Sequence, residues 1–180
     1  MSIMGSLRVH EKARADVAPR GGADGHNFRQ AMRELASGVS VITCGEGDAR
    51  NGCTATSVVS LSLSPPTLLV CLNLHTSTLA SIRQTGSFCV NLLAAEHKEI
   101  AERFAGVGGF KGAGRFSLGD WTPLVTGAPV LSDGLAAFDC RVEEIIERHT
   151  HAIVIGVVEA VRVPGADEAL IHWRSRFETL

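Results

Sequence analysis

The spacing of apolar residues changes several times along the chain, and the first regular stretch predicts a helix. Phe28, Met32 and Leu35 recur every three or four residues after Asn27, a residue type that often caps helices. A Ser-Gly pair at 37–38 ends this pattern. The helix is therefore expected to present one apolar face.

Most later segments show the alternation or the continuous apolar character of strands. Strands are expected at residues 39–44, 53–64, 67–72, 88–93, 135–146, 151–163 and 169–173. The run 67–72 is apolar almost throughout and is expected to be buried on both faces. Short helices are expected over about 78–84 and over 94–104, followed by a glycine-rich loop at 106–119.

The order of these elements favours a mainly β fold. Strands do not alternate regularly with helices, which argues against a doubly wound parallel sheet. An antiparallel barrel with a few peripheral helices fits better. Residues 1–26 mix charges of both signs with glycines and are predicted to form a flexible tail, so 27–180 is expected to be a single domain.

Composition narrows the classes of partner and the compartment. The net charge of −2 offers no field that would draw the chain to nucleic acid or to an anionic membrane surface. No apolar run is long enough to span a bilayer, and the first residues lack an export signature. Five cysteines without a C-x-x-C pair indicate buried free thiols in a reducing compartment. We therefore expect a cytoplasmic protein.

Several common catalytic and binding motifs are missing. Gly106 and Gly108 begin a G-x-G-x-x-G pattern, but Lys111 replaces the third glycine and a helix precedes it, which excludes a Rossmann dinucleotide site. There is no P-loop and no G-x-S-x-G elbow. His149 and His151 share a strand face without a carboxylate or thiolate, so no metal site is expected.

Small polar side chains gather in and after the strands instead. Thr54, Thr56 and Ser60 place hydroxyls on one face of the strand predicted at 53–64. They fit a flat ligand that needs hydrogen-bond donors and little steric bulk. An ordinary solvated strand face explains them equally well.

A second polar group follows a buried strand and begins a helix. Thr76, Ser77 and Thr78, together with the free N–H groups of that helix, are suited to bind a phosphate. A plain helix cap is the alternative. Asn73 and Asn91 lie near strand ends in apolar surroundings, where their amides need partners; a turn hydrogen bond is the common one.

A series of motifs in fixed order connects these groups. They are FRQAM at 28–32, GCTATS at 52–57, SPP at 64–66, VCLN at 70–73, CVN at 89–91, RFAG at 103–106, RFS at 115–117, Trp121, PVL at 129–131, TH at 150–151, LIHW at 170–173 and RF at 176–177. In this order they resemble the short-chain flavin reductases of two-component monooxygenases, and most of all the reductase components of 4-hydroxyphenylacetate 3-monooxygenases. The resemblance covers residues 28–177, nearly the whole chain outside the predicted tail.

The resemblance implies an FMN-binding split β-barrel, with antiparallel, Greek-key-like strands, that works as a homodimer with flavin near the subunit interface. By position, residues 54–57 would line the flavin ring, and Ser60 belongs to the same polar strand. Phe104 would cover the outer part of the flavin, and His151 would lie on the nicotinamide side. The resemblance assigns the ring surround to Thr54, Ala55, Thr56, Ser57, Cys89, Val90 and Asn91, and the ribityl chain and phosphate to Asn73, Thr76, Ser77 and Thr78.

The chain departs from the family pattern at a few positions. Thr76 replaces a more usual serine and keeps the hydroxyl, whereas His149 occupies the place of a common glycine. The chain has no tyrosine, so His172 and Phe177 replace ring hydroxyls that are common near the C-terminus.

The implied activity is an NAD(P)H:flavin oxidoreductase that supplies reduced FMN or FAD to an oxygenase component by diffusion. The cofactors would be FMN or FAD, with NADH or NADPH as hydride donor. Two alternatives remain: a non-catalytic flavin carrier or sensor, and a split-barrel reductase acting on another substrate, such as a corrinoid or a pyridoxamine phosphate. An arginine would be needed for an adenine-side phosphate, and Arg83, Arg115, Arg174 and Arg176 are all candidates.

Overall fold

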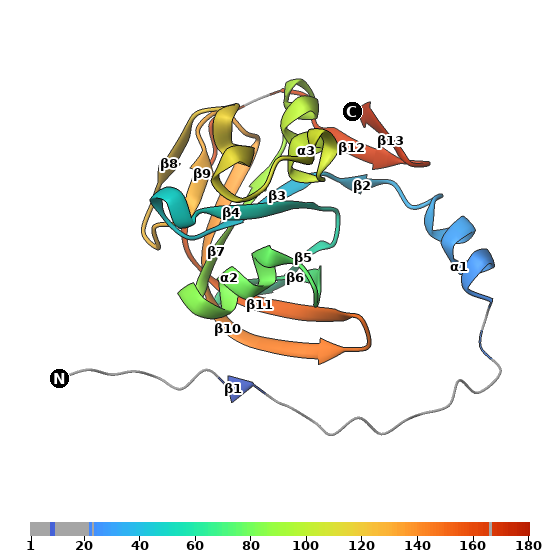
Figure 1. The fold of residues 1–180 in the computed structure, drawn as a ribbon, viewed down its shortest axis with the longest axis horizontal. Helices are drawn as coiled ribbons and strands as arrows, with labels where there is room; N and C mark the ends of the chain where they lie inside the picture. The colour runs from blue at the N-terminus through green and yellow to red at the C-terminus, as the bar shows by residue number, and fades with distance from the viewer. Residues whose placement is uncertain (1–7, 10–21, 23, 166) are drawn as a thin grey trace.

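The computed structural model describes residues 8–9, 22, 24–165 and 167–180 (Figure 1). The predicted tail at 1–26 lies largely outside these residues. Its last two residues belong to the first helix, α1 (Gly25–Met32).

One large sheet forms the body of the molecule. Its strands follow the order β4-β3-β7-β10-β11-β6-β5, all neighbours being antiparallel, and β1 (Arg8–Val9) lies parallel to β10. The bounds are β3 Ser40–Cys44, β4 Asn51–Ala55, β5 Val58–Leu63, β6 Pro66–Asn73, β7 Ser87–Leu92, β10 Ala136–Arg148 and β11 His151–Arg162. The prediction of a mainly β, antiparallel fold is confirmed.

The prediction of one continuous strand at 53–64 is wrong. The structure divides it into β4 and β5, which lie at opposite edges of the sheet order although Thr56 and Ser57 alone separate them. The sheet must therefore curl until its two edges approach each other, which produces a barrel that is open at this point. The Ser57 hydroxyl anchors the break, since it donates to Cys71 O at 2.9 Å and accepts from Cys71 N at 3.2 Å.

Two small sheets flank the barrel. One contains β2 (Ser37–Gly38), β12 (Leu170–Trp173) and β13 (Arg176–Thr179), and the other is the β8 (Trp121–Pro123) and β9 (Pro129–Leu131) hairpin. The sequence patterns did not predict β2, β8, β9 or β13, because strands of two to four residues are too short to show a period.

The helices occupy the positions that the sequence predicts, with shifted ends. The remaining ones are α2 Ser77–Thr85, α3 Lys98–Phe104 and the 3-10 turns η1 Gly47–Ala49, η2 Ala95–His97, η3 Val107–Gly109 and η4 Gly112–Ser117. The predicted loop at 106–119 thus contains two 3-10 turns. Gly86, with φ of 69°, ends α2 in the left-handed conformation.

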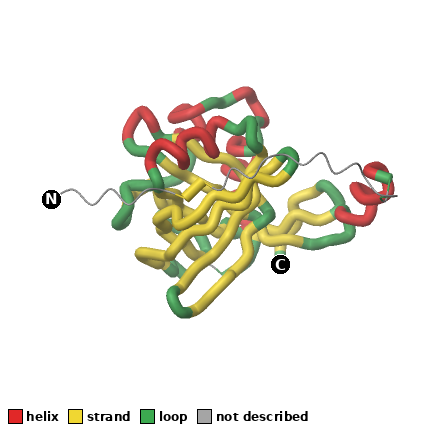
Figure 2. Tube along the Cα trace, turned by 90° about the horizontal axis from the view of Figure 1, so that it is seen from below, coloured by secondary structure: helices red, strands yellow, loops and turns green. Residues whose placement is uncertain are grey.

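Helix α1 stands apart from the barrel in two views at right angles (Figures 1 and 2). Asp24, rather than the predicted Asn27, caps it, because the Asp24 carboxylate accepts from Asn27 N at 3.4 Å. Phe28 is 61% exposed and Met32 46%, so the apolar face predicted for this helix has no partner among the described residues of the single chain.

The core fills the inside of the barrel. Phe88 of β7 is fully buried and packs against Gly156 of β11, where an added Cβ would lie 2.6 Å from the Phe88 ring. Burial alternates along β6 from Leu68 onward, so Leu69 and Cys71 are partly exposed and the prediction of burial on both faces is wrong. All five cysteines are free thiols. No helix in the described parts of the chain has the length and apolar character needed to cross a membrane.

Burial of thiols in this core predicts a loss of stability in alkali. Burial raises the pKa of the Cys44 and Cys140 thiols from 9.0 to about 12. Above pH 9 the unfolded chain gains charge on these thiols while the folded chain keeps them neutral. The free energy of unfolding is therefore expected to fall as the pH rises from 9 towards 12. Urea denaturation at pH 8, 9.5 and 10.5 checks this, and a Cys44→Ala variant should show a shallower decline.

Candidate functional site

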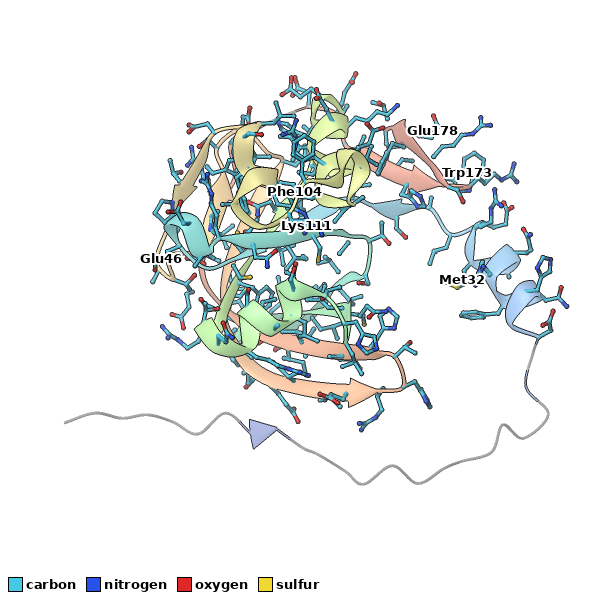
Figure 3. All side chains as sticks on the ribbon, in the orientation of Figure 1. Met32, Glu46, Phe104, Lys111, Trp173 and Glu178 are labelled. Carbon is cyan, nitrogen blue, oxygen red and sulfur yellow. The ribbon has the colours of Figure 1, made fainter. Side chains whose placement is uncertain are left out.

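A cavity of about 820 Å³ opens where β4, β6 and the start of α2 meet. Ten of the predicted site residues line it, namely Thr54, Ala55, Thr56, Ser57, Asn73, Thr76, Ser77, Thr78, Phe104 and His151. Figure 3 labels Phe104 in the upper part of the view, above β4. Residues from segments far apart in the sequence thus meet at one cavity of a size that holds a cofactor.

Four predicted site residues do not line this cavity. Ser60 is an exposed residue of β5, beyond the break at 56–57. Cys89, Val90 and Asn91 are buried in β7. Strand β7 lies in the middle of the sheet, between β3 and β10, so the expectation that these three residues close the ring pocket is not met in the single chain.

Asn91 has a structural role instead. Its amide nitrogen donates to Val41 O and to the Thr43 hydroxyl, both at 3.1 Å, and its amide oxygen accepts from Leu131 N at 2.8 Å. These bonds connect β7 with β3 and β9. The sequence correctly indicated that this buried amide needs partners, but the partners are protein groups.

Two hydroxyls of the segment 54–57 also form hydrogen bonds with other protein groups. Thr54 Oγ1 donates to Ala101 O of α3 at 2.6 Å, and the Ser57 hydroxyl is bonded to β6. Their side chains hold the cavity wall in place, which leaves small side chains and main chain to face a ligand. Thr56, in the connection between β4 and β5, is exposed at the cavity.

The beginning of α2 provides the strongest donor group of the cavity. Thr76 is the helix cap: its hydroxyl accepts from Leu79 N at 3.3 Å and donates to Asn73 O at 2.9 Å. The next main-chain N–H groups, at Ser77 and Thr78, have no intrahelical acceptor. Thr78 is fully buried, and its hydroxyl has no hydrogen-bond partner among the described residues. An unsatisfied buried hydroxyl beside a helix N-terminus fits an anionic ligand group.

The Thr78 hydroxyl allows a direct test of this interpretation. Thr78→Val keeps the side-chain shape and removes an oxygen that makes no bond within the described chain. The melting temperature is expected to stay the same or rise, while the affinity for a phosphate-bearing ligand falls roughly tenfold. Isothermal titration with FMN and thermal unfolding measure the two effects. A variant that loses stability and keeps its affinity would show that the hydroxyl serves the fold.

Asn73 and His151 lie side by side at the edge of the cavity. They are register partners at the ends of β6 and β11. Asn73 Oδ1 accepts from His75 N at 2.9 Å, which is the turn bond expected of an asparagine at a strand end. His151 is exposed, and its Nδ1 lies 2.8 Å from the Thr150 hydroxyl. His149 has φ of 52° and therefore a left-handed backbone. Glycine adopts this conformation without strain, which explains why the resemblance places a glycine at this position.

The charges around the cavity favour anions. No aspartate or glutamate is among the lining residues, and Arg115 is the lining arginine. Arg115 Nη1 donates to Gly52 O and its Nε to Phe110 O at 3.1 Å, which ties the loop after α3 to β4. Of the other arginines proposed for an adenine-side phosphate, Arg83 pairs with Glu147 and Arg174 pairs with Glu34 at 2.7 Å, and neither these two nor Arg176 lines the cavity. Arg115 is therefore the best placed.

Further lining residues were not assigned from the sequence. They are Cys53, Cys71, Leu72, His75, Ala105, His172 and Phe177. His172 and Phe177 come from the β12 and β13 strands, and their rings meet edge to face with centroids 5.7 Å apart. Their position so far along the chain from β4 gave no local signal that they share its cavity.

Phe104 closes the inner side of the cavity through close packing. Its ring lies against Gly52, where an added Cβ would be 2.8 Å from Phe104 Cε1. It also meets Phe116 edge to face at 4.9 Å and Trp121 at 5.5 Å. Gly52 is needed at this close approach, which accounts for the glycine in the GCTATS motif.

Cys53, one of the two cysteines that line the cavity, is protonated at neutral pH and therefore a poor nucleophile. Burial raises the pKa of Cys53 above its ordinary value, and the Arg115 charge offsets this only in part. The lining residues also offer no carboxylate pair. The arrangement is suited to bind and orient a ligand that itself carries the chemistry.

A separate cluster of Glu96, His97 and Asp133 has metal-ligand residue types. His97 Nδ1 accepts from Ala94 N at 3.2 Å, so the ring proton of the neutral imidazole is on Nε2. This proton points to Asp133 Oδ1, 3.3 Å from Nε2. The nitrogen that faces the carboxylates is therefore a donor, and the cluster stabilises the turn before α3.

Comparison with known proteins agrees with this geometry. A family model described as "Flavin reductase like domain" matches residues 32–180. An FMN reductase (NADH), RutF, from Agrobacterium fabrum is 40% identical over 154 residues, covering 86% of this chain and 87% of the relative. The 4-hydroxyphenylacetate 3-monooxygenase reductase component of Pseudomonas aeruginosa is 37% identical over 153 residues, covering 85% and 90%.

A solved structure extends the likeness to three dimensions. The NADH:FAD oxidoreductase SgcE6 of Streptomyces globisporus, in complex with NAD and FAD fragments, superposes with a TM-score of 0.77 at 28% identity. The match covers 86% of this chain and 92% of that one. The split-barrel topology predicted from the motifs is thus confirmed.

Proposed function

The chain belongs to the flavin reductase like domain family, and from this premise we propose that it reduces FMN or FAD with NADH or NADPH and supplies the reduced flavin to a partner monooxygenase. Relatives named FMN reductase (NADH) and monooxygenase reductase component support this activity. The solved structure of SgcE6 with NAD and FAD fragments supports both a nicotinamide and a flavin nucleotide as ligands.

The observation that carries the proposal is the cavity at the start of α2. It joins an unsatisfied buried hydroxyl at Thr78, a helix N-terminus and Arg115, with no acidic side chain in its lining. These groups fit the phosphate of a flavin nucleotide. All residues of the family motif at 52–57 except Gly52 line the same cavity, where small side chains leave room for a flat ring.

Each group is proposed to have a distinct role. Residues 54–57 would contact the ring, Asn73 and Thr76 the ribityl chain, and Ser77 and Thr78 the phosphate. Phe104 would cover the ring, and His151 would orient the nicotinamide. A bound flavin would accept a hydride, which carries both electrons, from the nicotinamide; the protein's part would be to orient the two ligands and to exclude water.

The activity is tested by mixing purified protein with each pairing of NADH or NADPH and FMN or FAD in air. Absorbance at 340 nm should fall faster than in protein-free controls for at least one pairing, and the four rates rank the preferences. If all four rates equal the background, the enzymatic proposal is wrong.

Two other functions make different predictions. A flavin carrier or sensor would keep its flavin through gel filtration, whereas a reductase that releases its product should elute largely without flavin. A split-barrel reductase for another substrate, such as a corrinoid, would oxidise NADH only when that substrate is added. Gel filtration of flavin-loaded protein, followed by the absorbance assay, separates the three.

The proposed role of His151 gives a kinetic prediction. His151→Ala is expected to raise KM for NADH about tenfold, since an orienting contact to the nicotinamide is lost, while the affinity for FMN changes little. His149→Asn is the matched control, because it changes a neighbouring histidine outside the cavity and asparagine tolerates the left-handed backbone. Equal KM values for wild type and His151→Ala would show that His151 does not orient the nicotinamide.

We further propose that the protein is a cytoplasmic homodimer whose folded domain spans 27–180. The exposed apolar face of α1 supports this, as do exposed side chains on β5, where Val59 is 54% and Leu63 88% accessible. The free thiols are in keeping with a reducing compartment. Analytical ultracentrifugation tests the dimer, and deletion of residues 25–35 should weaken it.

A further inference from the structure

A second cavity, of about 480 Å³, lies beside the β8–β9 hairpin and shares no lining residue with the flavin cavity. Its walls come from the η1 turn and from the segment 121–129. The volume falls within the range of roughly 300–1,000 Å³ that is usual for small-molecule sites.

Arg50 is the unusual group of this cavity. Its Nε is buried and has no hydrogen-bond partner among the described residues. The ion pairs of the described chain involve Arg83, Arg103, Arg141, Arg174 and His97, so Arg50 has no carboxylate partner there. Its guanidinium lies 4.9 Å from the centroid of the Phe116 ring, which supports one face of the cation. A partly buried guanidinium without an acceptor is costly unless an anion satisfies it.

Apolar side chains form part of the remaining lining, and hydrogen bonds hold one wall of the cavity in shape. Trp121, Pro123, Leu124 and Pro129 provide hydrocarbon surface. The segment between β8 and β9 is fixed by the fully buried Asp139, whose carboxylate accepts from Val125 N at 2.7 Å and from Thr126 N at 2.8 Å. A wall anchored in this way is present before a ligand arrives.

Glu46 limits the kind of anion that fits. It lines the same cavity, and its carboxylate packs directly against Gly127, since an added Cβ there would be 1.9 Å from Glu46 Oε1. A second negative charge on a ligand would be repelled by this carboxylate. The lining therefore suits one carboxylate on an apolar body better than a phosphate.

We propose that this cavity is a binding site for a small organic monocarboxylate, with the Arg50 guanidinium holding the carboxylate and the apolar lining holding the hydrocarbon part. Aromatic rings link it to the flavin cavity: the ring of Trp121, which lines this cavity, has its centroid 5.5 Å from that of Phe104, which lines the flavin cavity. The site is independent of the proposed reductase activity, so either can fail without the other.

Titration calorimetry of the full chain with benzoate tests the proposal. One benzoate is expected to bind per chain. Benzyl alcohol, which has a similar shape but no charge, and inorganic phosphate are each expected to bind at least about tenfold more weakly than benzoate. Arg50→Gln should weaken benzoate by about the same factor, and Arg50→Lys by less. Arg141→Gln, which changes an exposed arginine outside both cavities, should leave it unchanged.

Two further measurements locate the bound benzoate. Saturating FMN should not displace it, because the two cavities share no residue. In a Trp173→Phe background Trp121 is the remaining tryptophan, and its fluorescence should change on binding. If Arg50→Gln destabilises the fold, Leu124→Asp provides a second test, since it places a negative charge in the lining and should also weaken benzoate. Displacement by FMN, equal binding of benzyl alcohol, or insensitivity to both variants would overturn the proposal.

Discussion

Replacing Ser77 with aspartate is expected to lower the affinity for FMN about 100-fold without unfolding the protein. Ser77 is the first residue of α2, so a carboxylate there lies beside the proposed phosphate position. Two unit charges about 4 Å apart repel by roughly 1 kcal/mol in water and 4 kcal/mol near a protein surface. The same carboxylate at a helix N-terminus contributes about 0.3–1 kcal/mol to stability. Affinity and stability are therefore expected to change in opposite directions.

The controls for Ser77→Asp isolate the charge and the phosphate. Ser77→Asn is close in size to aspartate and neutral, and should cost only a few-fold in FMN affinity. Riboflavin lacks the phosphate, so its weaker affinity should be the same in wild type and Ser77→Asp. Fluorescence titration with both flavins measures this. A loss of riboflavin affinity equal to that of FMN would place the ring, and not the phosphate, next to α2.

Asp139→Ala is expected to cause the largest loss of stability, about 3 kcal/mol. Asp139 is fully buried, and its carboxylate accepts from two main-chain N–H groups, at Val125 and Thr126, and from the Thr126 hydroxyl. Each buried donor left without an acceptor costs about 1–3 kcal/mol, and water entering this surface segment recovers part of that. For a chain of this length the melting temperature should fall by about 10 °C.

Two milder substitutions at this hydrogen-bond network are expected to cause smaller losses of stability than Asp139→Ala. Asp139→Asn keeps one carbonyl acceptor and should cost roughly half as much, and Thr126→Ala removes one hydroxyl and should cost about 1 kcal/mol. Urea denaturation measures all three. Flavin reduction should persist in each variant at temperatures where it is folded, because Asp139 does not line the flavin cavity. If Asp139→Ala unfolds with the same urea midpoint as the wild type, these hydrogen bonds contribute nothing to the free energy of unfolding.

Local sequence patterns were sufficient for most elements of the barrel. A β-branched run predicted β3 and largely apolar runs predicted β6 and β7, and Thr76 with Gly86 marked both ends of α2, because a cap and a left-handed glycine act within one helical turn. The hydroxyl group at 76–78 was recognised from its position after a strand for the same reason. Interactions between residues close in the chain leave their signal in the local pattern.

Closure of the barrel was not visible in that pattern. The alternation at 53–64 continues through Thr56 and Ser57, yet the chain breaks there, because β4 pairs with β3 and β5 with β6 at the two edges of the sheet. Pairing with distant strands decides where a strand ends when both options satisfy the local period. Asn91 shows the same limit: its need for partners was evident, but β3 and β9 supply them.

The amino-acid sequence by itself determined the mainly β class, the presence of the three helices, the free thiols and, through ordered motifs, the family. Only the tertiary structure decided that Arg115, His172 and Phe177 join residues 54–57 at one cavity, that Cys89–Asn91 lie away from it, and that Arg50 lies beside a second one. The physical reason is that a cavity is bounded by side chains whose separation along the chain carries no information on their distance in space, which long-range strand pairing and core packing alone establish.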